Sequence, residues 1–512
     1  MTLSAQDKLR IAQALDEVGI DFIEGGWPGS NPKDRAFFKE ARNLHLKHAQ
    51  LCAFGSTRRP QFTPEEDPNL QALLEADTPA ISIFGKSWLL HVHRALRITA
   101  AENLSLIRSS VAYLKSHGKY VIYDAEHFFD GYQDNPEYAL STLKAAEEAG
   151  ADVLVLCDTN GGMLPDEVYS IVSAVQRHVQ TPLGIHAHND TGCAVANSIM
   201  AVLAGARHVQ GTINGIGERC GNADLCTIIP NLQLKRGFAL VRPEQLQKLT
   251  ELSRLVDELA KLHPIDRAPY VGRSAFAHKG GIHVSAILKA PQTYEHIPPE
   301  TVGNQRRVLI SDLSGQSNIS YRLQELNQRI TDREKLRAIV EHIKALEHKG
   351  YEFEAADASV ELIIQDFLGN KADFFTRERC CVSSTLAPTA YSEATLVVRI
   401  GNHRELAAAE GKGPVDALSQ ALRRALLPFY PGLENVRLTD YKVRVVHPAE
   451  GTRAPVRVLI EHSNGSQRWT TVGVSNNILE ASWEALADGM RYALLITKAT
   501  PPIPTLTSTT SS

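Results

Sequence analysis

The sequence lacks the long apolar runs and the charge excess that mark membrane proteins and nucleic-acid-binding proteins. No stretch of its 512 residues reaches the roughly 18 apolar residues of a membrane-spanning helix, and no basic region followed by an apolar run opens the chain. Its 54 basic and 58 acidic side chains nearly cancel, so no basic surface for contacting phosphates is expected. We therefore expect a cytoplasmic protein that binds neither membranes nor nucleic acid.

Cysteine is also scarce, and its arrangement argues against a disulfide framework or a zinc knuckle. The seven cysteines are an odd number and show no metal-knuckle spacing. Cys380 and Cys381 are neighbours, and a disulfide between adjacent residues would be strained. The composition, 43% hydrophobic and 22% charged, is that of a globular protein, and the length exceeds what one core usually supports. We expect a reduced protein of more than one domain.

What is present, from residue 5 to about residue 232, is a recurring helical stretch, a glycine or polar break, and a short β-branched run. This alternation is typical of βα units around a parallel sheet. The first helix is predicted to end at Gly19. Strands are predicted at residues 21–26, 49–54, 80–84, 120–124, 153–158, 183–188 and 208–214. They predict an α/β fold, a (β/α)8 TIM barrel that lacks its first strand, because the sequence opens on a helix.

Beyond the barrel the pattern changes. A helix is predicted at 246–262, loops and short helices at 275–303, and mostly helices at 319–349. Strands at 392–400 and 442–446 and helices at 414–427 and 478–498 then indicate a separate α+β module. We predict an incomplete barrel domain at 1–265, linker subdomains at 266–370, an α+β domain at 371–500 and a disordered tail at 501–512.

Two histidines close the sixth predicted strand, in the segment Gly-Ile-His-Ala-His-Asn-Asp at residues 184–190. Because side chains alternate faces along a strand, His186 and His188 point the same way and can share a metal at the barrel mouth. The glycine-rich segment 214–224 follows the next strand, and its Asn222 amide oxygen can complete a nitrogen and oxygen shell suited to Mg²⁺, Mn²⁺ or Zn²⁺. Taken alone, each segment also fits a structural histidine or an ordinary turn.

Two other strand ends bring polar groups to the same mouth. They are Asp-Ala-Glu-His at residues 124–127 and Asp-Thr-Asn-Gly at residues 158–161. Either can be a helix cap, but converging strand ends favour a shared site. Outside the barrel, the segment 276–283 ends in His283, which can reach over the mouth as an acid or base.

At these residues the sequence resembles, over nearly its whole length, the acyl-CoA condensing family that includes isopropylmalate, homocitrate and citramalate synthases. The resemblance is strongest to the citramalate-forming branch that leads to isoleucine. The segments that carry it are Glu-Gly-Gly-Trp-Pro-Gly-Ser-Asn-Pro-Lys-Asp at 24–34, Ser-Ala-Phe-Ala-His-Lys-Gly-Gly-Ile-His at 274–283 and Thr-Thr-Val-Gly-Val at 470–474.

The resemblance implies roles for the barrel residues. It implies that His186, His188 and Asn222 bind a divalent metal, and that Glu126 and Thr159 lie at the keto-acid site. The metal would chelate pyruvate and polarise its keto group, a base would form the enolate of acetyl-CoA, and hydrolysis of the thioester would release citramalate and CoA. Residues 1–265 would then be the catalytic domain.

The resemblance also implies roles outside the barrel. It implies that His283, with Tyr294 nearby, transfers protons, and that the protein is a homodimer in which this subdomain covers the partner's barrel. Residues 371–500 resemble a regulatory domain that binds a branched-chain amino acid, here isoleucine. Its segment with Gly411, Gly413 and Asp416 opens a helix.

Two other functions stay open, and one family motif has no match. In the first, the enzyme takes 2-oxoisovalerate or 2-oxoglutarate, as isopropylmalate and homocitrate synthases do; in the second, the chain is a non-catalytic isoleucine-binding partner. Family members begin with a strand ending Thr-Leu-Arg-Asp-Gly, whose Arg assists catalysis and whose Asp binds metal; residues 1–7 align after it. We expect that Met1 is internal, and that without this strand the barrel is open, its edges are exposed and its metal site is weaker.

Overall fold

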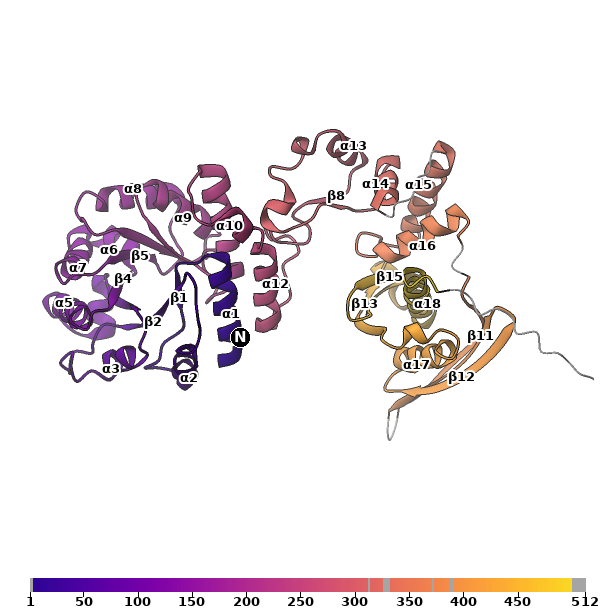
Figure 1. Cartoon of the computed structure of the whole chain (residues 1–512), viewed down its shortest axis with the longest axis horizontal. Coiled ribbons are helices and arrows are strands. Elements are labelled where there is room, and N and C mark those ends of the chain that lie inside the picture. Colours follow the sequence, from indigo (N-terminus) through magenta and orange to yellow (C-terminus); the bar gives the residue numbers. More distant parts are fainter. Residues whose placement is uncertain (1–2, 312–313, 326–331, 371–372, 387–389, 500–512) are drawn as a thin grey trace, which may run out of the picture. The chain divides into compact units, whose positions relative to one another are not determined.

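The chain forms two compact units in the computed structural model, which describes residues 3–311, 314–325, 332–370, 373–386 and 390–499 (Figure 1). The first unit comprises residues 1–276 and 297–306, and the second comprises 277–296 and 307–512. The polypeptide therefore passes three times from one unit to the other. The predicted tail, 501–512, lies outside the described residues.

The first unit is built on a parallel sheet of seven strands in sequence order. The strands are β1 (Phe22–Glu24), β2 (Gln50–Ser56), β3 (Ala80–Lys86), β4 (Tyr120–Glu126), β5 (Val153–Asp158), β6 (Leu183–Ala187) and β7 (His208–Gln210). The longer helices are α1 (Ala5–Val18), α2 (Pro32–Ala41), α3 (Pro68–Glu75), α5 (Ala100–Ser116), α7 (Pro136–Glu148), α8 (Pro165–Val175), α9 (Ala194–Leu203) and α12 (Leu249–Ala260). They surround the sheet (Figure 1). The prediction of seven strands in βα units is confirmed. β7 is shorter than the predicted strand at 208–214, because residues 213–215 form a 3-10 turn.

The sheet is curled like a barrel but is not closed. The ring of Phe22 in β1 lies 5.3 Å from the ring of Tyr120 in β4 and 5.7 Å from that of His208 in β7, measured between centroids. The two edge strands thus approach the same interior. Among the described residues, however, β1 and β7 do not pair with each other. The curled sheet is open between them, as the strand count predicted.

Residues that face the inside of the sheet change from apolar to polar along the strands. Near the N-terminal ends a buried cluster holds Cys52, Ala80, Ile122 and Val155. Two residues after Ile122 comes Asp124, and two further comes Glu126, so the period of two carries polar groups toward the C-terminal ends. This gradient places the polar groups at the mouth of the curled sheet, where barrel enzymes hold their sites.

Local signals account for the ends of the first helix. Ser4 Oγ accepts a hydrogen bond from the Asp7 N–H at 3.1 Å, and the Asp7 carboxylate accepts one from the Ser4 N–H at 3.0 Å. This reciprocal cap starts α1. Gly19 ends the helix with φ +90°, a left-handed conformation that glycine adopts without strain, as predicted. Both ends of this helix are therefore marked by residue types that can be recognised in the sequence.

The second unit begins with a small helical part. Two short strands, β8 (Ala277–His278) and β9 (Arg307–Val308), pair in parallel. The helices are α13 (Gly281–Lys289), α14 (Gln316–Glu325), α15 (Arg333–His348) and α16 (Asp357–Leu368). Their core includes Ile339 of α15 and Ile364 of α16, with Val472 from a strand of the following module. The helical part and that module therefore share one apolar core.

The rest of the second unit repeats a three-strand and helix motif. Antiparallel strands β10 (Thr376–Thr385), β11 (Tyr391–Ile400) and β12 (His403–Gly411) precede α17 (Pro414–Leu426); β13 (Arg437–Val445), β14 (Val456–Ser463) and β15 (Arg468–Ser475) precede α18 (Ile478–Ile496). α17 packs on β11 and β12, and α18 packs on β14 and β15. This confirms the predicted α+β module. No helix among the described residues is long and apolar enough to cross a membrane.

The imidazole of His462 in β14 is sealed inside this module. It is 0% exposed, neither ring nitrogen has a hydrogen-bond partner in the described part of the chain, and Gly489 of α18 lies so close that a Cβ there would meet Cε1 at 2.1 Å. Burial lowers the pKa of His462 to about 4. The folded module therefore holds a neutral histidine without polar contacts.

Acid is expected to destabilise the module through His462. The unfolded chain takes up a proton near the ordinary histidine pKa of about 6.5, whereas the folded chain does so only near 4. Stability from this group is therefore complete above pH 6.5 and falls as pH drops toward 4, by on the order of 3 kcal/mol. Urea unfolding at pH 7 and pH 4.5 should show a smaller loss for His462→Leu than for the wild type. Equal losses in the two proteins would contradict this origin.

Candidate active site

Three predicted ligand residues come together at the mouth of the curled sheet. The rings of His186 and His188 are 5.3 Å apart between centroids, at the end of β6. His188 forms an isolated β-bridge with Asn222, which brings the amide beside the second imidazole. This backbone bridge joins two residues that lie 34 positions apart along the chain.

Two atoms of these three side chains have lone pairs that could coordinate a metal. Within the described residues, Nδ1 of His188 and Oδ1 of Asn222 are buried without a hydrogen-bond partner. A buried polar atom left without a partner costs about 1–3 kcal/mol, which a bound cation would offset. Burial, then the charges of His186 and Arg219, lower the pKa of His188 to about 4, so its imidazole is neutral at pH 7 and able to coordinate. The residues fit a divalent metal.

The donor set differs from a carboxylate-rich metal site. Over the described ranges, no group of three or more His, Cys, Asp and Glu side chains is arranged to hold a metal. What the chain offers is two imidazoles and one amide. Such a mixed nitrogen and oxygen set is compatible with several divalent ions.

The loop that carries Asn222 is tightly packed and clamped. A Cβ on Gly217 would lie 2.1 Å from Nδ2 of Asn222, and a Cβ on Gly221, whose φ is +92°, would lie 2.0 Å from the Gly215 carbonyl oxygen. Arg219 donates two hydrogen bonds to Asp190, at 2.8 and 2.9 Å, and one to the Thr159 carbonyl at 2.7 Å. The glycines and this clamp fix Asn222 against the ends of β5 and β6.

Glu126 and Thr159 end neighbouring strands at the same mouth. Glu126 forms an ion pair with Lys86 of β3. The Thr159 hydroxyl accepts a hydrogen bond from the His127 N–H at 2.9 Å. The neighbouring Asp158 has a different task, because its carboxylate accepts N–H groups of Gly162 and Met163 at 3.1 and 3.3 Å and closes its own loop. Asp158 therefore closes the loop, and Thr159 remains the residue of this strand end predicted to lie at the site.

Sequence reasoning gave no role to three inward-facing polar residues, Glu24, Lys86 and Gln210, and it treated Asp124 only as part of a polar strand end. Desolvation, then the negative charge of Asp124, raise the pKa of Glu24. Burial raises the pKa of Asp124 as well. The strand period places Asp124 on the same face as Glu126, but Glu24, Lys86 and Gln210 lie on other strands, and only the strand register brings them to this interior.

His283 and Tyr294 belong to the second unit, and the structure brings them together there. Their rings stack, 4.0 Å apart between centroids with planes inclined by 21°. Both side chains are exposed, His283 in the first turn of α13. Their roles in proton transfer remain predictions.

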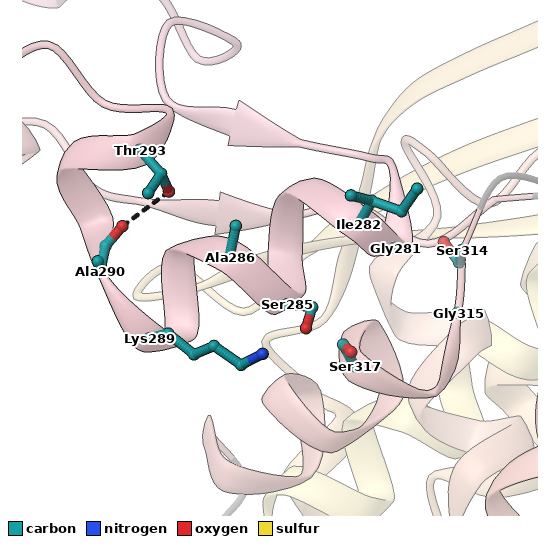
Figure 2. A pocket seen from close by; sticks show the side chains of 10 residues that line it. All are labelled: Gly281, Ile282, Ser285, Ala286, Lys289, Ala290, Thr293, Ser314, Gly315 and Ser317. Atoms are coloured by element: carbon teal, nitrogen blue, oxygen red, sulfur yellow. Dashed lines mark hydrogen bonds between the residues drawn. The ribbon is translucent and has the colours of Figure 1, made fainter.

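A hollow of about 650 Å³ lies beside the same turn, between α13 and the start of α14. It is lined by Gly281, Ile282, Ser285, Ala286, Lys289, Ala290, Thr293, Ser314, Gly315 and Ser317. Figure 2 shows that the Lys289 side chain extends its amine toward the part of the hollow where the Ser285 and Ser317 hydroxyls lie. The lining thus combines small side chains and hydroxyls with one cation.

The segment predicted to form the regulatory loop leads into α17. Asp416 accepts a hydrogen bond from the Lys412 N–H at 2.9 Å, which closes the turn before the helix that begins at Pro414. A Cβ on Gly411 would lie 2.3 Å from the Ala417 nitrogen, so the turn requires glycine there. Gly413 has open space around it. The helix start is as predicted, and the regulatory role of these residues stays a prediction.

The sequence matches three family profiles in succession. They are HMGL-like at residues 1–256, homocitrate synthase post-HMGL domain-like at 270–351, and LeuA allosteric (dimerisation) domain at 354–494. The (R)-citramalate synthase of Geobacter sulfurreducens is 54% identical, over 96% of this chain and 93% of that protein. That of Aquifex aeolicus is 53% identical, over 97% and 95%. The 2-isopropylmalate synthase of Methanocaldococcus jannaschii is 31% identical, over 96% and 92%.

Proposed function

The chain belongs to the (R)-citramalate synthase family of acyltransferases, and we propose from this that it condenses acetyl-CoA with pyruvate to give citramalate and CoA. The observation that carries the proposal is the 54% identity to an (R)-citramalate synthase over 93% of its length. The lower identity of 31% to a 2-isopropylmalate synthase favours pyruvate over the larger 2-oxoisovalerate. The unpartnered donors at the sheet mouth supply a site for the reaction.

His186, His188 and Asn222 would hold the divalent metal, Mg²⁺, Mn²⁺ or Zn²⁺. The two unpartnered atoms, Nδ1 of His188 and Oδ1 of Asn222, support this assignment. When bound, the ion would polarise the keto group of pyruvate as a Lewis acid. The loop that carries Asn222 keeps the amide in place through the Arg219–Asp190 clamp.

Glu126 and Thr159 would bind and orient pyruvate beside these ligands. The Thr159 hydroxyl already accepts the His127 N–H, so its own proton is free to point toward a substrate carboxylate. The Lys86 ammonium holds the Glu126 carboxylate. We assign proton transfer to His283, with Tyr294 stacked on it: the histidine would take a methyl proton of acetyl-CoA, and the enolate would attack the keto carbon. Water would then hydrolyse the thioester of the product, which releases CoA and citramalate.

We also propose a homodimer that is inhibited by isoleucine and works in the cytoplasm. The match of residues 354–494 to the LeuA allosteric (dimerisation) domain supports the dimer and an effector site. The turn with Gly411, Gly413 and Asp416 is where we place contacts to isoleucine. The reduced state of all seven cysteines agrees with that compartment.

A thiol-release assay with acetyl-CoA and a panel of keto acids tests the proposal. We expect metal-dependent CoA release with pyruvate, at least about tenfold faster in kcat/KM than with 2-oxoisovalerate or 2-oxoglutarate, because added methylenes change binding by about 1–3 kcal/mol. A preference for either larger acid would move the chain to another branch of the family. Calorimetric binding of isoleucine without any CoA release would identify a non-catalytic sensor instead.

A further inference from the structure

A line of hydrogen bonds crosses the inside of the sheet and ends on one metal-site imidazole. Nδ1 of His186 lies 2.8 Å from Oε1 of Gln210 in β7. Nε2 of Gln210 donates to Oδ1 of Asp124 in β4 at 2.9 Å. The Ser82 hydroxyl of β3 donates to the other oxygen of Asp124 at 2.7 Å. Four strands thus contribute one residue each.

The directions of these bonds determine which nitrogen of His186 carries the proton. Both oxygens of Asp124 accept, so the NH₂ group of Gln210 faces Asp124 and its carbonyl oxygen faces the histidine. A carbonyl oxygen can only accept, and Nδ1 of His186 must therefore be the donor. The other ring nitrogen, Nε2, then carries a lone pair.

We infer that Gln210, oriented by Asp124, is a positioning residue that fixes His186 as its Nδ1–H tautomer and so prepares Nε2 to bind the metal. The inference rests on the proposed function for the identity of the site, and it assigns a role to two residues for which neither the resemblance nor the comparisons supply one. Partners of this kind set the orientation and basicity of metal-binding histidines.

Because the residues at the centre of this line are buried, water does not easily replace the hydrogen bonds between them. Ser82 is 0% exposed and Asp124 is 4% exposed, so solvent does not compete for the Asp124 oxygens. Through this line His186 is held in place before any metal binds, and loss of Gln210 should weaken metal binding through that ring.

The test is the tautomer of His186 in the metal-free protein, read from ¹⁵N chemical shifts of labelled histidine. We expect Nδ1–H in the wild type and a shift toward Nε2–H in Gln210→Leu. Calorimetric titration with Mn²⁺ should show affinity reduced about 10–100-fold in Gln210→Leu, the range for lost outer partners of a ligand. Asp124→Asn, which still offers an acceptor to Gln210, should lie closer to the wild type.

Gln71→Leu is the matched control, because it removes a glutamine side chain on α3 that bonds the Tyr113 hydroxyl at 2.9 Å, outside the sheet. It should leave the tautomer and the Mn²⁺ affinity unchanged. An Nε2–H tautomer in the wild type would overturn the inference without any variant, as would wild-type Mn²⁺ affinity in Gln210→Leu. Absence of CoA release with every keto acid, beside the expected tautomers, would instead overturn the proposed function alone.

Discussion

Replacing Asn222 with leucine is expected to lower turnover roughly 100-fold or more while changing the free energy of unfolding by only about 1 kcal/mol. Polarisation of a carbonyl by a metal contributes several kcal/mol, and each 1.4 kcal/mol corresponds to a factor of ten. The fold loses little, because among the described residues Oδ1 of Asn222 makes no hydrogen bond and Nδ2 makes one, to the Ile216 carbonyl at 3.2 Å. Steady-state CoA release and urea unfolding measure the two effects.

Asn197 on α9 provides a control of the same kind. In the part of the chain that the structure describes, its Oδ1 is also buried without a partner, and its Nδ2 makes one hydrogen bond, to the Met163 carbonyl at 2.9 Å. Asn197→Leu should therefore match Asn222→Leu in stability but keep wild-type turnover. Mn²⁺ should raise the melting temperature of the wild type and of Asn197→Leu more than that of Asn222→Leu. Equal loss of activity in both variants would argue against Asn222 as a ligand.

The second large effect is expected from Gly221→Ala. The new Cβ would lie 2.0 Å from the Gly215 carbonyl oxygen, at a φ of +92° that alanine adopts only with strain. The loop must therefore shift, and it would move Asn222, the next residue, out of its position. Displacing a site group by about 1 Å can cost about 100-fold in rate, so we expect a loss of that size in kcat/KM. Destabilisation should exceed the roughly 1–2 kcal/mol of left-handed strain alone.

Gly118→Ala separates strain from steric clash. Gly118 also has a positive φ, +71°, but a Cβ there would meet nothing within 4 Å. This variant should show only the conformational cost and full turnover. If Gly221→Ala behaves like Gly118→Ala in both assays, the loop is more tolerant than its packing indicates, and Asn222 does not depend on it.

Local signals in the sequence were enough to find most elements of the fold. The cap at Ser4, the glycine at Gly19 and the β-branched strand runs lie within a few residues of the structure they specify, so α1 and the seven strands were predicted. The end of β7 was predicted wrongly: the strand pattern continued to residue 214, whereas residues 213–215 form a 3-10 turn in which Asn214 adopts φ +61°. The residue type alone did not reveal that conformation.

The ligand residues were easier to find than the residues that support them. His186 and His188 stand two apart on one strand, so their common direction follows from the strand period. Asp124 and Gln210 are 86 residues apart, and only the order of strands around the curled sheet brings them to 2.9 Å. Pairing across a sheet depends on register, which a single sequence does not display.

The threefold passage of the chain between the units has a consequence for limited proteolysis. Residues 297–306 belong with the first unit, where Val302 is 0% exposed and its carbonyl accepts a hydrogen bond from Thr250 at 2.7 Å. Asn304 donates to the Tyr270 carbonyl at 2.8 Å. A nick between residues 276 and 277 would therefore leave the N-terminal fragment still bound to its complement through this insert. Deleting everything after 276 would instead strip a piece of core from the first unit and leave it prone to aggregate.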